Sequence, residues 1–90
     1  MTHDEARAHI LTAIEHSTPI LNHPRIARRL SDPLNEIAFA DLDLDSLTSM
    51  EICLTIEDRT GQLIEPGDLL LYPGINALAA FLADRSRSAA

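Results

Sequence analysis

The sequence predicts a small all-α fold, a bundle of four helices of which three are longer and one is short. Two observations support this. Apolar residues recur at helical spacing in several segments, and no segment alternates between apolar and polar residues as a strand does. The chain has 90 residues, the length of one small domain. We therefore expect a single domain over residues 1–84 and a polar, disordered tail over residues 85–90.

The first helix is expected to run from Asp4 to His16. Acidic residues at its start suit the positive end of a helix dipole. Ile10, Leu11 and Ile14 fall on one stripe at helical spacing. The Ser-Thr-Pro run that follows ends the helix.

A long connection follows, from Pro19 to Asp45. Three prolines punctuate it, and a structureless loop of this length is unusual in a compact domain. We therefore expect the connection to form a helical turn near Arg25–Leu30 and to pack through its apolar side chains. These are Ile20, Leu21, Ile26, Leu30, Leu34, Ile37 and Phe39.

Three further helices are expected in the second half of the chain. One covers Ser46–Thr60, because Asp45 or the serine after it is a good N-cap and Gly61 is a typical helix stop. A short helix covers Gly67–Tyr72, just after a Glu-Pro pair that favours a helix start. The last covers Ile75–Asp84, where apolar residues recur at i, i+3, i+4 and i+7.

The composition limits the possible partners. The chain has 14 acidic residues against 7 arginines, a net charge of −7. Such a surface repels phosphate, which argues against nucleic acid and against an anionic membrane. No apolar run approaches the ~20 residues of a membrane span, and the N-terminus has no signal-peptide pattern. We expect a monomeric, cytoplasmic protein.

The helix expected at Ser46–Thr60 carries two apolar stripes on opposite sides. One stripe is formed by Ile52, Cys53 and Ile56. The other is formed by Leu47, Met50 and Leu54. Three carboxylates border the second stripe, on Glu51, Glu57 and Asp58. Because burying those charges is costly, we expect the first stripe in the core and the second to be a docking face. The alternative is that the long connection covers the second stripe.

Charge is concentrated in the same part of the chain. Residues 41–70 contain eight acidic side chains and one basic side chain, Arg59, so this segment accounts for the whole net charge of −7. A solvated acidic face is the common explanation of such a pattern. Docking to partners with basic patches is the more specific interpretation.

The run Leu42–Glu51 (LDLDSLTSME) combines an acidic, apolar approach to Asp-Ser-Leu with a glutamate five residues after the serine. It resembles the attachment motif of acyl carrier proteins, the phosphopantetheine-binding carrier domains. The similarity extends through Ile56-Glu57-Asp58 and Ile64 to Leu82. The resemblance implies a substrate carrier without catalysis of its own.

By this resemblance, Ser46 receives 4′-phosphopantetheine from coenzyme A, with Asp45 and Leu47 beside it. The arm would carry an acyl or aminoacyl group as a thioester in a polyketide, fatty-acid-like or nonribosomal peptide pathway. The implied partners are a phosphopantetheinyl transferase, a ligase or acyltransferase that loads the arm, and downstream synthases or transferases. The docking residues of the family match the face described above, Leu47, Met50, Glu51, Leu54, Glu57 and Asp58.

Several positions depart from the family pattern. Asp43 stands where family members usually have glycine, and Thr60 stands where they have phenylalanine. The first connection is longer and contains three arginines, which we expect to be solvated. These are Arg25, Arg28 and Arg29. The departures favour a specialised, stand-alone carrier.

Two other interpretations concern the same residues. The three aspartates at 41, 43 and 45 match the start of a calcium-binding EF-hand loop, but Ser46 and Ile52 stand where that loop needs glycine and glutamate. We therefore expect no metal site. In the other interpretation, Ser46 only caps a helix, and the chain is a non-carrier helical adaptor that shares the docking face. Cys53 is expected to be a small buried residue and not a nucleophile.

Overall fold

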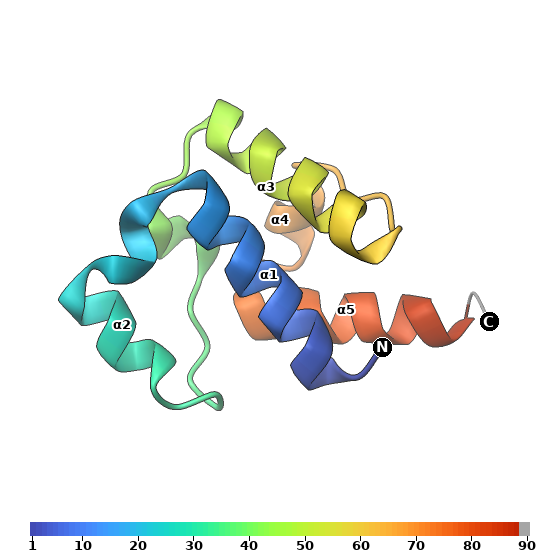
Figure 1. Ribbon diagram of the computed structural model, residues 1–90, viewed down its shortest axis with the longest axis horizontal. Helices are drawn as coiled ribbons and strands as arrows, with labels where there is room; N and C mark the ends of the chain where they lie inside the picture. The colour runs from blue at the N-terminus through green and yellow to red at the C-terminus, as the bar shows by residue number, and fades with distance from the viewer. Residues whose placement is uncertain (89–90) are drawn as a thin grey trace.

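The computed structural model describes residues 1–88 and is all-α in this range, as predicted (Figure 1). The elements in order are α1 (His3–Ser17), η1 (Pro19–Asn22), α2 (Pro24–Leu30), η2 (Phe39–Leu42), α3 (Ser46–Thr60), α4 (Asp68–Leu71) and α5 (Ile75–Ser88). The two η elements are short 3-10 helices. The helical turn expected near Arg25–Leu30 is a full short helix, α2.

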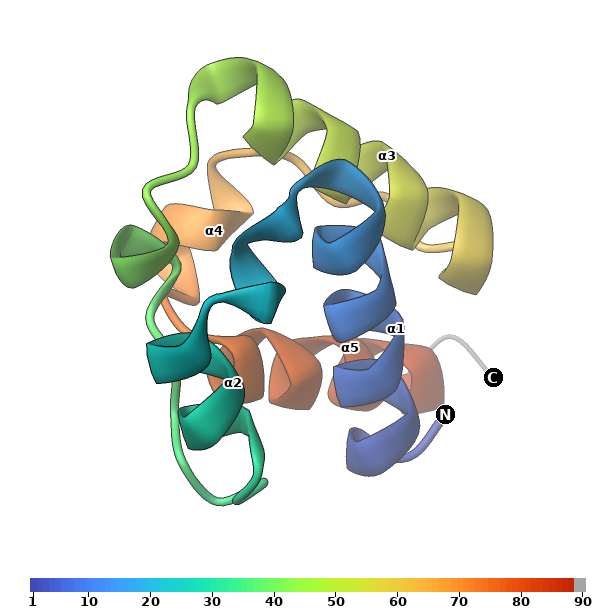
Figure 2. The same ribbon diagram turned by 60° about the vertical axis from the view of Figure 1, so that its left-hand side comes forward.

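Helix α1 lies between α3 and α5 and packs on both (Figures 1 and 2). Its start is fixed by a capping box, in which Glu5 N–H donates to Thr2 Oγ1 at 3.1 Å and Thr2 N–H donates to Glu5 Oε1 at 3.0 Å. These hydrogen bonds to Thr2 hold the pKa of the Glu5 carboxyl below its usual value. The central position of α1 lets one helix complete the core against two others.

The core is built from aliphatic side chains of the three long helices. Its fully buried members include Ile10, Ile14, Ile52, Ile56, Leu78 and Leu82. The stripe predicted to be core on α3 is confirmed, since Ile52, Cys53 and Ile56 are all buried. Burial, with a smaller contribution from the negative charge of Asp68, raises the pKa of the Cys53 thiol to about 11. This residue therefore behaves as a small apolar group in the core.

Helix α5 is longer than predicted. It continues past Asp84 to Ser88, because Arg85 is bound to the chain that follows α3. Arg85 Nε donates to Gln62 Oε1 at 2.8 Å, and its Nη2 donates to the Leu63 carbonyl at 2.7 Å. The guanidinium also lies over the Phe81 ring, 4.8 Å from the centroid. The disordered tail predicted from residue 85 is therefore helical over 85–88, and its last two residues lie outside the described residues.

The long connection packs on the bundle through most of the apolar residues named for that role. Ile26, Ile37 and Phe39 are buried. Leu34 is the exception: it is 88% exposed, and the prediction that it packs is wrong. Its N–H donates to Asp32 Oδ1 at 2.9 Å, so residues 32–34 form a tight local turn that carries the leucine side chain away from the core.

The end of the connection is fastened to the start of α5. Phe39 N–H donates to the Pro73 carbonyl at 2.8 Å, and Ile75 N–H donates to the Ile37 carbonyl at 3.0 Å. We name these paired segments, residues 36–39 and 73–75, the backbone tie. Within it, the Glu36 carboxylate accepts the backbone N–H groups of Asn76 at 2.8 Å and of Ala77 at 3.0 Å. A side chain in the connection thus caps α5.

Candidate functional site

The start of α3 is capped by Asp45 and not by Ser46. Asp45 Oδ1 accepts the Thr48 backbone N–H at 2.7 Å, which is the usual geometry of an N-cap. This hydrogen bond holds the pKa of the Asp45 carboxyl below its usual value. Ser46 is the first helical residue, is exposed, and its hydroxyl has no hydrogen-bond partner among residues 1–88. Capping therefore does not account for this serine.

The approach to Ser46 contains a left-handed residue. Asp43 ends η2 with φ 52 and ψ 48, and it is the one non-glycine residue with positive φ among residues 1–88. Glycine adopts this conformation without strain, whereas aspartate is among the few other residues that tolerate it. The motif that this run resembles usually has glycine at this position, and the left-handed conformation of Asp43 is one that glycine favours.

A groove with a volume of about 510 Å³ opens beside Ser46. Its walls come from η2, the first turns of α3, and the segment around α4. The lining residues are Phe39, Ala40, Asp43, Leu44, Asp45, Ser46, Ser49, Met50, Pro66, Leu69, Leu70 and Pro73. Most of these side chains are apolar, and none is basic. A flexible, neutral or apolar group attached at Ser46 would find a matching surface here.

Sequence reasoning missed two walls of this groove. Neither η2 nor α4 was singled out as part of a site, although Phe39 and Leu70 both line the groove. Leu70 is 84% exposed. The apolar sequence of this short helix gives no indication of that exposure. These residues reach the site through the tertiary fold, so no local signal could have identified them.

The outer face of α3 is open to solvent. Leu47 is 69% exposed, Met50 51% and Leu54 58%. Glu51 and Asp58 are exposed, and Glu57 is half-buried. The long connection does not cover this face, so that alternative is wrong. The six residues share one side of α3, which is the arrangement the spacing predicted.

The three aspartates that resemble the start of an EF-hand loop have separate surroundings. Asp41 forms an ion pair with Arg29, with a distance of 3.2 Å from Oδ2 to Nη1. Asp45 caps α3. Within residues 1–88, no group of three or more histidine, cysteine or acidic side chains is arranged to hold a metal ion. The contact with Asp41 also corrects the expectation that Arg29 is solvated.

A comparison with protein families places the chain. The family model described as the phosphopantetheine attachment site matches residues 25–82, which span α2 to most of α5. The chain belongs to this family. Domains of the phosphopantetheine attachment family hold 4′-phosphopantetheine covalently and are typically non-catalytic carriers. No curated protein and no solved structure matches the chain.

The residues of this phosphopantetheine-binding domain fit the cofactor that the family carries. The Ser46 hydroxyl is exposed and unpartnered among the described residues, as an attachment atom must be. It stands at the start of a 15-residue helix, whose positive end favours a phosphate. The groove beside it offers apolar surface for the rest of an arm. Separately, no helix in residues 1–88 has the length and apolar character needed to cross a membrane.

Proposed function

We propose that this chain is a single-domain carrier protein in which Ser46 holds 4′-phosphopantetheine. The thiol of the bound arm would carry an acyl or aminoacyl group as a thioester. The chain would shuttle that group between enzymes of a polyketide, fatty-acid-like or nonribosomal peptide pathway and would catalyse no step itself. We also propose, from the sequence alone, that the protein is cytoplasmic and monomeric.

The chain's own residues have defined tasks in this proposal. Ser46 Oγ supplies the oxygen of the phosphodiester bond, while the nucleotide half of coenzyme A leaves. Asp45 fixes the first turn of α3 by accepting the Thr48 N–H, and this keeps the Ser46 side chain free of the cap. Leu47 follows the serine on the exposed side of the helix. A separate phosphopantetheinyl transferase with Mg²⁺ would supply the phosphoryl-transfer chemistry.

The outer face of α3 is the proposed docking surface. It consists of the exposed stripe and its bordering acids, Leu47, Met50, Glu51, Leu54, Glu57 and Asp58. The partners would be the transferase, a loading ligase or acyltransferase, and downstream synthases or transferases. Exposed apolar side chains among carboxylates suit enzymes that present apolar pockets ringed by basic residues.

The observation that carries the proposal is that Asp45, and not Ser46, caps the start of α3. Asp45 caps the helix, so the Ser46 hydroxyl stays free beside an apolar groove. The adaptor alternative gave Ser46 the role of a helix cap, and its neighbour fills that role instead. An adaptor would need neither the free hydroxyl nor the groove.

The deciding experiment is the intact mass of the protein after incubation with coenzyme A, Mg²⁺ and a broad-specificity phosphopantetheinyl transferase. We expect the parent to gain one phosphopantetheinyl group and Ser46→Ala to gain none. Ser49→Ala is the matched control, because Ser49 lies on the same helix and lines the same groove. It should load like the parent. A folded parent that stays unmodified both here and in its native host would overturn the proposal.

The docking surface has its own test. Reversing charge with Glu51→Lys and Asp58→Lys should raise the KM for the carrier in the loading reaction, most strongly at low salt. Glu15→Lys is the matched control, since Glu15 is an exposed acid on α1 and is not one of the six residues of the proposed docking surface. Equal effects of the control and the α3 variants would show that only net charge matters, and the docking role would be lost.

A further inference from the structure

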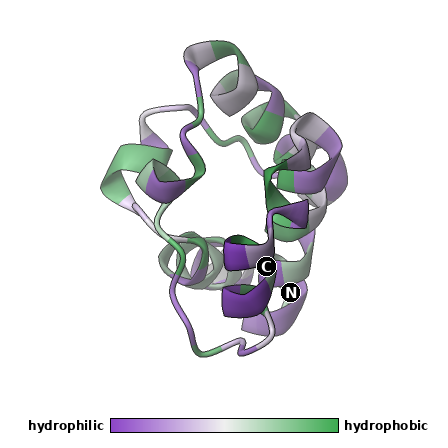
Figure 3. Cartoon of the chain, turned by 90° about the vertical axis from the view of Figure 1, so that its left-hand side faces the viewer, coloured by the Kyte–Doolittle hydropathy of each residue, from purple (hydrophilic) through white to green (hydrophobic). Residues whose placement is uncertain are grey.

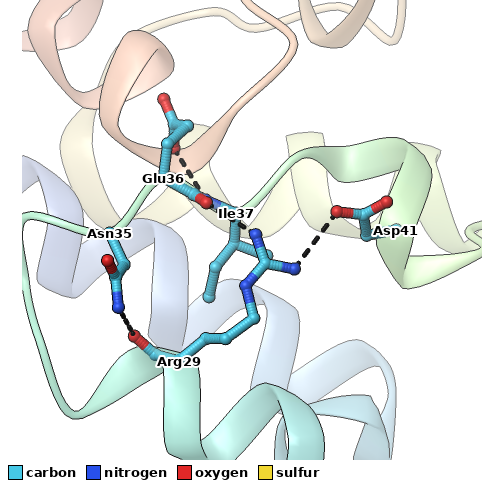
Figure 4. A network of polar contacts seen from close by, with 5 residues as sticks. All are labelled: Arg29, Asn35, Glu36, Ile37 and Asp41. Atoms are coloured by element: carbon cyan, nitrogen blue, oxygen red, sulfur yellow. Dashed lines mark hydrogen bonds and ion pairs between the residues drawn. The ribbon is translucent and has the colours of Figure 1, made fainter.

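Arg29 makes three contacts that converge on the segment leading to Ser46 (Figure 4). Its Nη1 pairs with Asp41 Oδ2 at 3.2 Å, and its Nη2 donates to the Glu36 carbonyl at 2.8 Å. Its own carbonyl accepts Asn35 Nδ2 at 3.3 Å. One side chain on α2 therefore spans the start of the backbone tie and the helix η2.

The segment that Arg29 holds is otherwise weakly fastened. After Phe39, whose N–H is bound to Pro73, the backbone of residues 40–44 makes only local hydrogen bonds. Leu42 is buried and anchors η2 by packing. Within residues 1–88, the contact between Arg29 and Asp41 is the one polar side-chain link between residues 40–44 and the rest of the chain. This same stretch forms a wall of the groove and ends at Asp45.

Arg29 differs from its neighbours on the same helix. Figure 3 looks onto α2 and shows hydrophilic residues on its turns. Arg25 and Arg28 are exposed, and their guanidinium groups have no partner among residues 1–88. Arg29 is half-buried and points back toward the chain. Three arginines that look alike in the sequence thus have two different roles in the structure.

We propose that Arg29 is a positioning residue for the attachment site: it holds η2 against α2 and so fixes the approach to Ser46. The proposal rests on the carrier function proposed above. Without Arg29, η2 would sample other placements, and only a fraction of molecules would present Ser46 correctly to a transferase.

The size of the effect follows from the exposure of the pair. The side chains of Arg29 and Asp41 are 41% and 51% exposed, so solvent screens their attraction. We expect a change of roughly two- to five-fold, as for other partly exposed ion pairs. If only a fraction of molecules is competent to bind, the apparent affinity falls by that fraction. The loss should therefore appear in the KM for the carrier and leave kcat unchanged.

The first measurement is amide hydrogen exchange of the unmodified protein, which does not depend on its function. Arg29→Ala and Asp41→Asn should each speed exchange over residues 41–43, whose amides are hydrogen-bonded within η2, and leave the amides of Ile52 and Ile56 unchanged. The double variant should be no worse than Arg29→Ala alone, because Asp41→Asn removes only an ion pair that Arg29→Ala has already removed. Arg28→Ala is the matched control, because it removes the same charge from the same helix and breaks no ion pair.

The second measurement is the kinetics of phosphopantetheinyl transfer at low and high salt. Arg29→Ala should raise the KM by roughly two- to five-fold at low salt, with the difference shrinking at high salt. Arg28→Ala should match the parent. A change in kcat, or an equal effect of Arg28→Ala, would overturn the positioning role, as would exchange that is unchanged in Arg29→Ala. If no transferase loads the parent, the attachment role of Ser46 fails, and the exchange data alone decide whether Arg29 holds η2.

Discussion

Helices α3 and α5 begin in different ways. Helix α3 is capped by the residue next to it, since Asp45 accepts the Thr48 N–H. Helix α5 is capped from a distance, since the Glu36 carboxylate accepts the Asn76 N–H across a separation of 40 residues. The first cap is a local property of the sequence, whereas the second exists only once the connection has folded onto the bundle.

The two helix starts therefore differ in what they leave exposed: α3 presents an unbonded hydroxyl, whereas the first N–H groups of α5 are bound to Glu36. The local cap on α3 uses one small side chain and leaves the next hydroxyl exposed, which is what covalent attachment requires. The distant cap on α5 uses that helix's N-terminal N–H groups to hold the connection in place. One helix start is therefore available for chemistry, and the other is part of the scaffold that supports it.

The largest effect should come from crowding the distant cap. A Cβ added at Gly74 would lie 2.3 Å from the Glu36 Cδ and 2.5 Å from its Oε2, so Gly74→Ala must push the carboxylate away from α5. Because this carboxylate is the far end of a flexible side chain and can move aside, the cost is that of the lost cap, and we expect a loss of roughly 0.5–2 kcal/mol in the free energy of unfolding. Urea denaturation followed by circular dichroism would measure it.

Two controls make this prediction specific. Gly67→Ala meets nothing within 4 Å and should change the unfolding free energy little. In the background of Glu36→Ala, which removes the cap and should itself cost about 1 kcal/mol, Gly74→Ala should become much less harmful because the clash is gone. Additive losses in the double variant would show that the carboxylate is not what the alanine displaces.

A smaller effect is expected at the local cap, where pH is the useful variable. The lowered pKa of Asp45 means that its carboxylate stabilises the fold above the pKa of the unfolded chain, near 4, and that this stabilisation is lost as the pH falls through the folded value. Asp45→Asn keeps a capping side chain without the charge. The parent should be slightly more stable than this variant at neutral pH, and the difference in urea midpoint should vanish in acid. A difference that does not depend on pH would contradict the role of the charged cap.

The same contrast explains how much of the molecule could be predicted from sequence. The bounds of α3, Ser46–Thr60, were predicted correctly because both ends carry local signals. Asp45 caps its start, and Gly61 ends it in the left-handed conformation with φ 73. The two apolar stripes of α3 were also separated correctly into a buried and an exposed side, because helical period and bordering charges are local information.

The features that were missed depend on contacts between distant residues. The end of α5 was placed at Asp84 because nothing near Arg85 reveals its bonds to Gln62 and Leu63. Arg29 could not be told from Arg25 and Arg28, since its partner Asp41 lies 12 residues away. The groove was missed for the same reason, because η2 and α4 meet α3 only in the folded chain.

The backbone tie has a consequence for how the groove can change shape. Phe39 and Pro73 are joined by a backbone hydrogen bond of 2.8 Å, and both line the groove. Their separation is therefore fixed for as long as α5 stays anchored. Any widening must come from lining side chains outside the tie, such as the exposed Met50 and Leu70. The hydrogen bond between Phe39 and Pro73 thus sets one rigid edge of the groove, and groups of different size would be accommodated by these exposed side chains.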